Sequence, residues 1–177
     1  VGSQVASGDI SPSGKQAVLE ARGEIFTLPA EHGVVRNLTR SSGVAERHPE
    51  WSPDGKTLAY FSDRTGEYEL TLRPADGSGG EEVLTSLGAG YRYTPWWSPD
   101  SRKIVFIDNL QVIRLIDVET RVLTEIDHGR WMTHPPLAGF SVSWSSDSRW
   151  IAYSRGLDNR QSAVFLYDTV SGERHQM

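Results

Sequence analysis

Serine, histidine and carboxylate side chains are the groups that could do chemistry in this 177-residue chain, and their spacing forms no catalytic motif. A serine hydrolase elbow (G-x-S-x-G), a zinc protease helix (H-E-x-x-H) and a phosphate-binding loop (G-x-x-x-x-G-K-S/T) are all missing from the sequence. The chain also has no cysteine, which excludes a thiol nucleophile, zinc–thiolate sites and iron–sulfur clusters. We therefore expect no catalytic residue, although the sequence leaves open a Ser–His–Asp site whose partners meet only in space.

Metal ligands are the second kind of chemistry to consider, because Asp127, His128 and His134 lie close together in the sequence. Their spacing matches no standard ligand pattern. Further aspartates recur two residues after a serine in short turn sequences, where an aspartate caps its own turn. These are Asp54, Asp100 and Asp147. We therefore predict neither a metal site nor a cofactor.

Net charge, apolar runs and chain length limit the classes of partner that the chain could bind and the number of domains it could form. The chain carries 18 Lys and Arg against 23 Asp and Glu, a net charge of -5, and has no basic run that would attract nucleic acid or an anionic membrane. No apolar stretch approaches the ~18 residues that a membrane-spanning helix requires. The length fits one domain, or a stretch of repeats that behaves as one.

An internal repeat supplies the elements that must position these side chains. Turn sequences that begin at Ser11, Ser52, Ser98 and Ser145 share the pattern Ser-Pro-Asp-Gly-Lys with few changes. A large apolar residue precedes each serine, and a leucine or aromatic residue follows eight positions after it. Proline presets φ, aspartate bonds its own backbone and glycine accepts positive φ, so each sequence predicts the turn of a β-hairpin.

Two further short strands follow each predicted hairpin. We expect third strands at 24–28, 68–72, 112–116 and 164–168, and fourth strands at 34–39, 82–85, 121–124 and 173–176, three of which end in Leu-Thr. Four short strands per unit, at a period of about 40–45 residues, are typical of β-propeller blades. The sequence therefore predicts an all-β chain with four four-stranded antiparallel repeats, as a partial or small propeller. The whole chain, 1–177, would be a single β-propeller region with blades at 5–40, 45–86, 92–126 and 138–177.

The repeat also carries a family resemblance. The second unit contains Pro49-Glu50-Trp51-Ser52-Pro53-Asp54-Gly55-Lys56, which resembles the Trp-Ser-Pro-Asp-Gly repeat of the TolB-like propellers. The stretch from Glu46 to Gly77 and the segment Tyr91-Arg92-Tyr93-Thr94-Pro95-Trp96-Trp97 are similar to the propeller region of tricorn-type proteases. The resemblance covers nearly the whole chain.

In the tricorn family, propellers precede a separate catalytic part and gate the passage of peptides. The resemblance therefore implies a non-catalytic module that binds or admits oligopeptides, with a TolB-like protein–protein interaction scaffold as the alternative. It favours the cytoplasm, whereas the Tol proteins are periplasmic. Relatives use six or seven blades, so four blades imply a fragment, a partial ring completed by self-association, or a small closed ring.

The usual blade order predicts which residues could contact a ligand. If the first strand of each blade lines the central channel, the loops from strand four to strand one and from strand two to strand three emerge on one face. Arginine there could bind a peptide carboxylate, and tyrosine could stack or form hydrogen bonds. The candidates are Arg47, His48, Arg64, Tyr91, Arg92, Tyr93 and His134. The alternative is that these side chains only bond neighbouring blades, with Arg64 in an ion pair with Asp63 that braces its loop.

Overall fold

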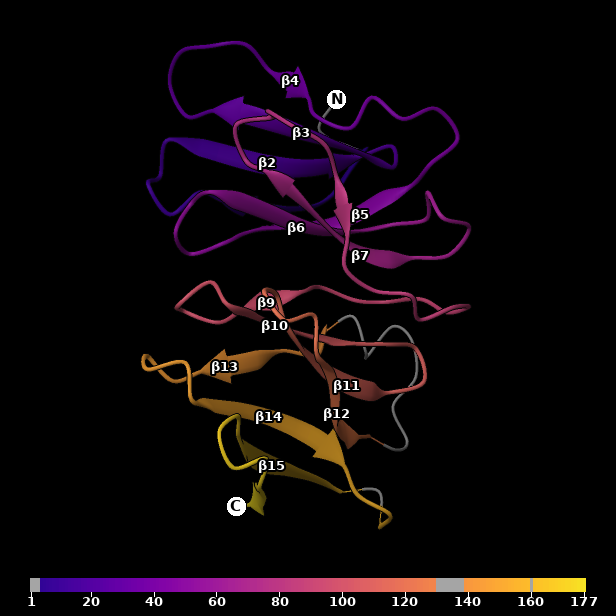
Figure 1. Cartoon of the computed structure of the whole chain (residues 1–177), viewed down its shortest axis with the longest axis vertical. Coiled ribbons are helices and arrows are strands. Elements are labelled where there is room, and N and C mark those ends of the chain that lie inside the picture. Colours follow the sequence, from indigo (N-terminus) through magenta and orange to yellow (C-terminus); the bar gives the residue numbers. More distant parts are fainter. Residues whose placement is uncertain (1–3, 130–138, 160) are drawn as a thin grey trace. The chain divides into compact units, whose positions relative to one another are not determined.

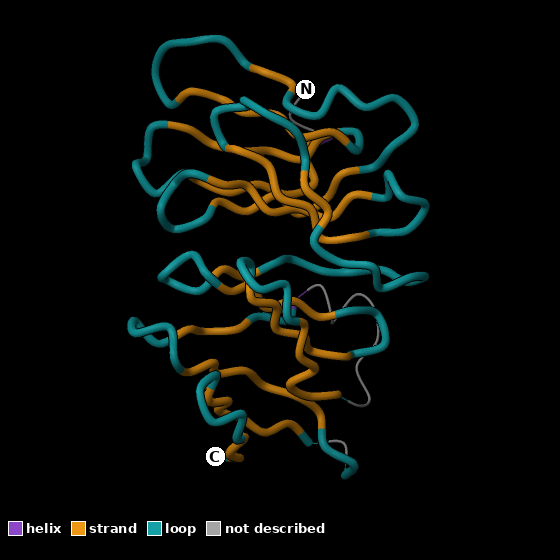
Figure 2. Tube along the Cα trace, in the orientation of Figure 1, coloured by secondary structure: helices purple, strands orange, loops and turns teal. Residues whose placement is uncertain are grey.

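The structure is a computed structural model that describes residues 4–129, 139–159 and 161–177. Its regular elements over these residues are sixteen β-strands, which form four antiparallel sheets of four strands each (Figure 1, Figure 2). The predicted all-β class and the four four-stranded antiparallel repeats are confirmed. Within the described ranges, no helix is long and apolar enough to cross a membrane.

Each sheet uses four consecutive strands, so every sheet is an antiparallel meander. The first contains β1 (Val5–Ile10), β2 (Gln16–Ala21), β3 (Glu24–Pro29) and β4 (Arg36–Asn37), and the second contains β5 (Glu46–Trp51), β6 (Thr57–Ser62), β7 (Glu69–Pro74) and β8 (Glu82–Val83). The third contains β9 (Trp96–Trp97), β10 (Lys103–Ile107), β11 (Val112–Asp117) and β12 (Leu123–His128). The fourth contains β13 (Val142–Trp144), β14 (Trp150–Gly156), β15 (Ser162–Asp168) and β16 (Arg174–Gln176).

The chain forms two compact units, Val1–Gly90 with the first two sheets and Tyr91–Met177 with the last two. We refer to them as unit 1 and unit 2. In Figure 1, unit 1 carries the strands coloured from indigo to magenta. Each unit is described by itself below.

The fourth strands differ most from their predicted bounds: β4 and β8 are shorter, and β12 begins at Leu123 and continues to His128. The expected end at Thr124 is therefore wrong. In the first two sheets the Leu-Thr threonines close the fourth strand, since the hydroxyl oxygens of Thr39 and Thr85 accept backbone N–H groups from the third strand at 3.1 and 2.9 Å. In β12 the Leu-Thr pair instead starts the strand, and pairing with β11 continues beyond it.

A hydrogen-bonded serine closes the turn between the first and second strands of every sheet. In the second sheet, Ser52 Oγ donates to Asp54 Oδ1 at 2.6 Å and accepts the N–H of Thr57 at 2.9 Å. Asp54 Oδ1 also accepts the N–H of Lys56 at 3.0 Å. The same bonds recur around the turn serines of the third and fourth sheets. The interpretation of the repeated aspartates as turn caps is thus confirmed.

The core of unit 1 lies between its two sheets. One cluster in it consists of apolar side chains of β2, β3, β5 and β6 and of the segments after β4 and β7, namely Val18, Ile25, Leu38, Trp51, Leu58, Tyr60 and Ala75. Strand β5 also bonds directly to the first sheet, because the N–H of Trp51 donates to Asp9 Oδ2 at 2.9 Å. The large residue before the turn serine therefore joins one sheet to the next.

The core of unit 2 also packs between two sheets. One cluster of buried residues in it contains Tyr93, Val105, Ile107, Ile113, Leu115, Ile126, Phe140, Ile151, Tyr153, Phe165 and Tyr167. Trp144, at the position of Trp51 in the repeat, packs against this cluster. The second and third strands supply most of both cores, as the short apolar runs of the sequence indicate.

Replacing Trp51 with alanine should destabilise the protein by about 3–5 kcal/mol, because this side chain is 6% exposed and its loss leaves a cavity between two sheets. Urea denaturation followed by circular dichroism measures the change. The matched control is Val34→Ala, at a residue that is 77% exposed, for which we expect a change within about 0.5 kcal/mol. Equal midpoints for the two variants would contradict the packing role of Trp51.

Candidate functional site

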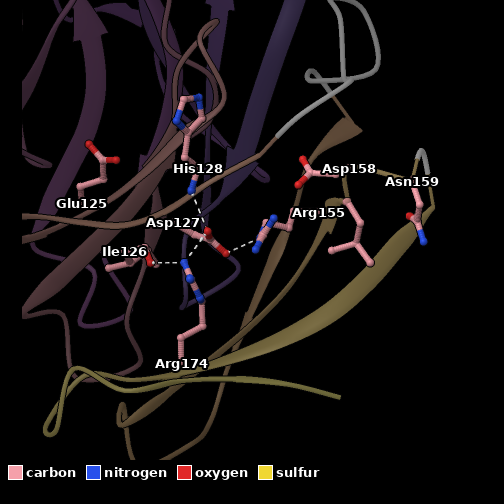
Figure 3. A pocket seen from close by; sticks show the side chains of 9 residues that line it. Glu125, Ile126, Asp127, His128, Arg155, Asp158, Asn159 and Arg174 are labelled. Atoms are coloured by element: carbon pink, nitrogen blue, oxygen red, sulfur yellow. Dashed lines mark hydrogen bonds and ion pairs between the residues drawn. The ribbon is translucent and has the colours of Figure 1, made fainter.

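Unit 2 contains a surface pocket of about 640 Å³ at the end of β12 (Figure 3). This volume lies within the range of about 300–1,000 Å³ that is usual for small-ligand sites. Its walls come from β12, from the end of β14 with the loop that follows, and from β16. The lining residues with a charge or a ring nitrogen are Glu125, Asp127, His128, Arg155, Asp158 and Arg174.

The carboxylate of Asp127 lies at the centre of this pocket, and its side chain is 3% exposed. Its Oδ2 accepts Arg155 Nε at 2.6 Å and the hydroxyl of Tyr153 at 2.8 Å. Its Oδ1 accepts Arg174 Nη1 and, at 2.8 Å, the backbone N–H of His128. Figure 3 shows both guanidinium groups directed at the carboxylate. Four donors from three strands thus surround one buried charge.

Both arginine side chains, besides pairing with Asp127, also lie over the ring of Phe165. Cζ of Arg155 lies 4.3 Å from the centroid of this ring, and Cζ of Arg174 lies 5.9 Å from it. The ring also stacks on Tyr153, with centroids 5.9 Å apart. Contacts of a guanidinium group with an aromatic face are attractive. Both arginines are therefore held in place by the protein before any ligand binds.

Each guanidinium group keeps N–H donors that the protein does not use. Besides Asp127, Arg155 donates from Nη1 to the carbonyl oxygen of Gly156 at 3.3 Å. Arg174 donates from Nη1 to the carbonyl oxygen of Ile126 at 3.4 Å. Within the part of the chain that the structure describes, Nη2 of each arginine has no acceptor. The side chains of Arg155 and Arg174 are 18% and 41% exposed, so these donors can reach a ligand.

The pocket forms where the sequence departs from the repeat. Counted from the turn serine, Arg155 occupies the place of Ser62 in the second sheet. Asp127 follows a buried apolar residue near the end of β12, and Thr39 follows one just after β4 in the first sheet. The hydroxyl of Thr39 accepts an N–H of its own sheet, from Ile25. Asp127 instead binds side chains of the next sheet, which is why a charged pocket replaces an ordinary strand end.

The sequence-based prediction did not find this group of residues. That prediction considers Asp127 only as a possible metal ligand, a role that it rejects, and does not include Arg155 or Arg174 among its candidates. Alignment of the turn serines gives a usable signal for Arg155 alone, since it stands ten positions after its serine, where the other units have Ala21, Ser62 and Asp108. No repeat position marks Arg174, whose contact with Asp127 depends on how the last two sheets pack.

The predicted contacts Arg47 and His48 lie on β5 of unit 1, beside a bulge in its pairing with β6. The N–H of His48 donates to Glu20 Oε2 at 3.0 Å, and His48 has a φ of +54°. Arg47 Nε donates to the hydroxyl of Tyr68 at 2.9 Å, and its Nη1 lies 3.9 Å from Glu20 Oε1. Burial lowers the pKa of His48, whereas the side chain of Arg47 is 39% exposed. Both residues bond the neighbouring sheet, and Arg47 also remains accessible.

Arg64 lies in the loop between β6 and β7. Its Nε is 3.0 Å from Glu81 Oε2, and its Nη2 is 3.7 Å from Glu46 Oε1. The expected partner Asp63 instead accepts the N–H of Ala45 at 2.7 Å. The side chain of Arg64 is 44% exposed, so it braces two segments of unit 1 and still faces solvent.

The predicted contacts Tyr91, Arg92 and Tyr93 lie at the start of unit 2. Arg92 is buried and pairs with Asp108 through an isolated antiparallel bridge. Tyr93 is 2% exposed and belongs to the core, with its ring 5.0 Å from the ring of Tyr91 in an edge-to-face contact. His134 lies outside the described residues. The structure thus brings the predicted residues together in two separate groups, one in each unit.

Two acidic side chains meet where β1 and β5 lie side by side in unit 1. Asp9 accepts the N–H groups of Ile10 and Trp51, at 2.7 and 2.9 Å. Glu50 lies next to it, and burial, the charge of Asp9 and a hydrogen bond with Asp9 raise the pKa of Glu50 to about 8. At neutral pH, Glu50 is therefore mostly protonated, and its carboxyl group donates a hydrogen bond to Asp9.

Four antiparallel meanders of four strands, joined in sequence and packed face to face within each unit, are the blades of a β-propeller protein. The chain belongs to the family of the tricorn protease second β-propeller domain, whose family model matches residues 5–177. The resemblance to TolB-like and tricorn propellers that the repeat predicts is confirmed.

Solved structures and a curated relative agree with this family. The crystal structure of the tricorn protease aligns with a TM-score of 0.79 and 18% identity, over 98% of this chain and 16% of that chain. TolB from Acinetobacter baumannii aligns with a TM-score of 0.69 and 21% identity, over 94% and 41%. YuxL, an uncharacterized peptidase of Bacillus subtilis (strain 168), is 32% identical over 152 residues, which cover 85% of this chain and 20% of YuxL. The chain spans 53% of the length of another curated relative.

The bond from Tyr153 to Asp127 can be tested against a residue at the same repeat position. Tyr153→Phe should cost about 1.5–3 kcal/mol, because it removes a hydrogen bond to a buried charge. Tyr60→Phe is the matched control, since the buried hydroxyl of Tyr60 makes no hydrogen bond within the described residues. Burial is the largest cause that raises the pKa of Tyr60, and Glu81 is the next. The position of the Tyr60 hydroxyl does not satisfy the geometry of a hydrogen bond to Glu81. Chemical denaturation that gives equal losses for both variants would contradict the role of Asp127.

Glu50 should make stability depend on pH. The folded protein holds the Glu50 proton up to about pH 8, whereas the unfolded chain releases it near 4.5. The free energy of unfolding should therefore fall as the pH rises between these values, by at most about 1.4 kcal/mol per pH unit. Glu50→Gln keeps a donor for Asp9 but cannot ionise, so its profile should be flatter. Urea denaturation across this range compares the two proteins, and parallel profiles would disprove the assignment.

Proposed function

We propose that this chain is a propeller module of a tricorn-like peptidase that binds or admits oligopeptides, and that it is not catalytic by itself. Membership in the tricorn second-propeller family supports the parent activity. The similarity to YuxL, which is described as a peptidase, supports it as well. Because the chain spans only part of its relatives, the activity of the whole protein belongs to this proposal.

The observation that carries the proposal is the pocket around Asp127. It is large enough for several atoms of a short peptide, and its arginine side chains are fixed by an ion pair and an aromatic ring. Peptides offer carbonyl and carboxylate oxygens, which are the acceptors that unused guanidinium donors bind. A site of this kind can hold a passing peptide without any reacting group.

Arg47, His48 and Arg64 remain the proposed peptide contacts of unit 1. Arg47 and Arg64 each pair with carboxylates of the fold and keep more than a third of the side chain exposed. We assign Tyr91, Arg92 and Tyr93 a supporting role at the start of unit 2, because Arg92 and Tyr93 are buried. His134, which lies outside the described residues, stays a proposed contact.

A second candidate is a scaffold that binds a folded protein partner, as the fold shared with TolB suggests. The exposed arginines could equally meet a protein surface, since arginine is enriched in interfaces. For a tricorn-like module we propose the cytoplasm, and for a TolB-like scaffold the periplasm. We also propose that the blades associate with further blades, either of another copy or of a longer parent chain.

The chain should bind short peptides, and the double variant Arg47→Gln/Arg64→Gln should weaken that binding by about tenfold, which corresponds to about 1.4 kcal/mol. Isothermal titration calorimetry with acetylated and free oligoalanine peptides measures the affinity. Arg36→Gln, at an exposed arginine of β4, is the control and should leave the affinity unchanged. Absence of binding by every peptide, together with capture of a folded protein, would favour the scaffold instead.

A further inference from the structure

We infer that the pocket around Asp127 is a subsite for a single carboxylate group of the ligand. This inference rests on the proposed peptide-binding function, because it names the chemical group that the same pocket accepts. The argument starts from its charges. Two guanidinium groups share one buried carboxylate, so the group of Arg155, Asp127 and Arg174 carries a net charge of +1.

The geometry of the two arginines fits a carboxylate. Asp127 occupies Nε of Arg155 and Nη1 of Arg174. The remaining donors of each group lie in the plane of its guanidinium, where they can form parallel bonds to two oxygen atoms. Because Asp127 and Phe165 already hold both groups, a ligand would pay little entropy to order them.

The other charges of the pocket limit how many carboxylates it accepts. Glu125, on β12, and Asp158, in the loop after β14, line the same cavity. Figure 3 shows the Glu125 carboxylate away from the Arg155–Asp127–Arg174 group and the Asp158 carboxylate on the side of Arg155. The negative charge of Glu125 would repel a second anion and attract a cation. The pocket should therefore favour a ligand with one carboxylate beside a neutral or cationic group, and reject polyanions.

A peptide can supply this carboxylate from its C-terminus or from an acidic side chain. Three probes separate these sources: acetyl-tetraalanine with a free C-terminus, the same peptide as a C-terminal amide, and an amide in which one alanine is replaced by glutamate. Calorimetry on the full chain should give an affinity for at least one carboxylate-bearing probe that is about tenfold higher than for the neutral amide. The better of the two acidic probes identifies the source.

The variant Arg174→Gln removes one guanidinium group and leaves Asp127 paired with Arg155. It should lower the affinity for the preferred acidic probe about tenfold and leave the affinity for the neutral amide unchanged. Arg102→Gln is the matched control, because Arg102 is an exposed arginine of unit 2 whose partner Glu119 is also exposed. Thermal unfolding of both variants checks that they remain folded.

Acetate alone tests the subsite without a peptide. Titration of the full chain with acetate should shift the NMR signals of the Nε–H groups of Arg155 and Arg174, and Arg102 should not respond. Equal binding of the acidic and neutral peptides, with no response to acetate, would overturn the carboxylate assignment and leave the proposed peptide binding intact. A response to acetate without binding of any peptide would instead contradict the proposed function and support the subsite.

Discussion

The serine hydroxyl at the first turn of each sheet is the interaction on which the rest of the structure depends. It accepts the N–H that opens the second strand, at 3.1, 2.9, 2.9 and 2.8 Å in the four sheets. This bond fixes the register of the first two strands. With the register fixed, the residue before the serine and the residue eight positions after it fall on the face that meets the preceding sheet within each unit. A slip by one residue would turn both away.

Buried carboxylates also join the sheets within each unit, beside the apolar packing. In unit 1, Asp9 and Glu20 of the first sheet accept N–H groups of β5, at 2.9 and 3.0 Å. In unit 2, Asp127 accepts side chains of the last sheet. Buried carboxylates are stable only when donors surround them. Each therefore specifies how its two sheets align, and Asp127 does so with arginines that keep further donors for a ligand.

Much of the fold follows from local sequence, because a turn and an alternating strand are decided by neighbouring residues. The four hairpin turns, the third strands and the all-β class needed no tertiary information. The end of β12 did require tertiary information. Leu123 and Thr124 resemble the residues at the ends of the fourth strands in other units, but here they begin the strand. Its true extent depends on pairing with β11, which the pattern of the repeat does not contain.

The sequence by itself determined the repeat, the blade architecture and the family, because these depend on residue types at fixed spacings. It also predicted Arg47, Arg64 and Tyr93 as ligand contacts without distinguishing among them. Only the tertiary structure separated the exposed arginines from the tyrosine in the core. It alone assembled the pocket, because Asp127 and Arg174 are 47 positions apart and meet through the packing of two sheets. Contacts across such separations depend on three-dimensional alignment, which no local pattern encodes.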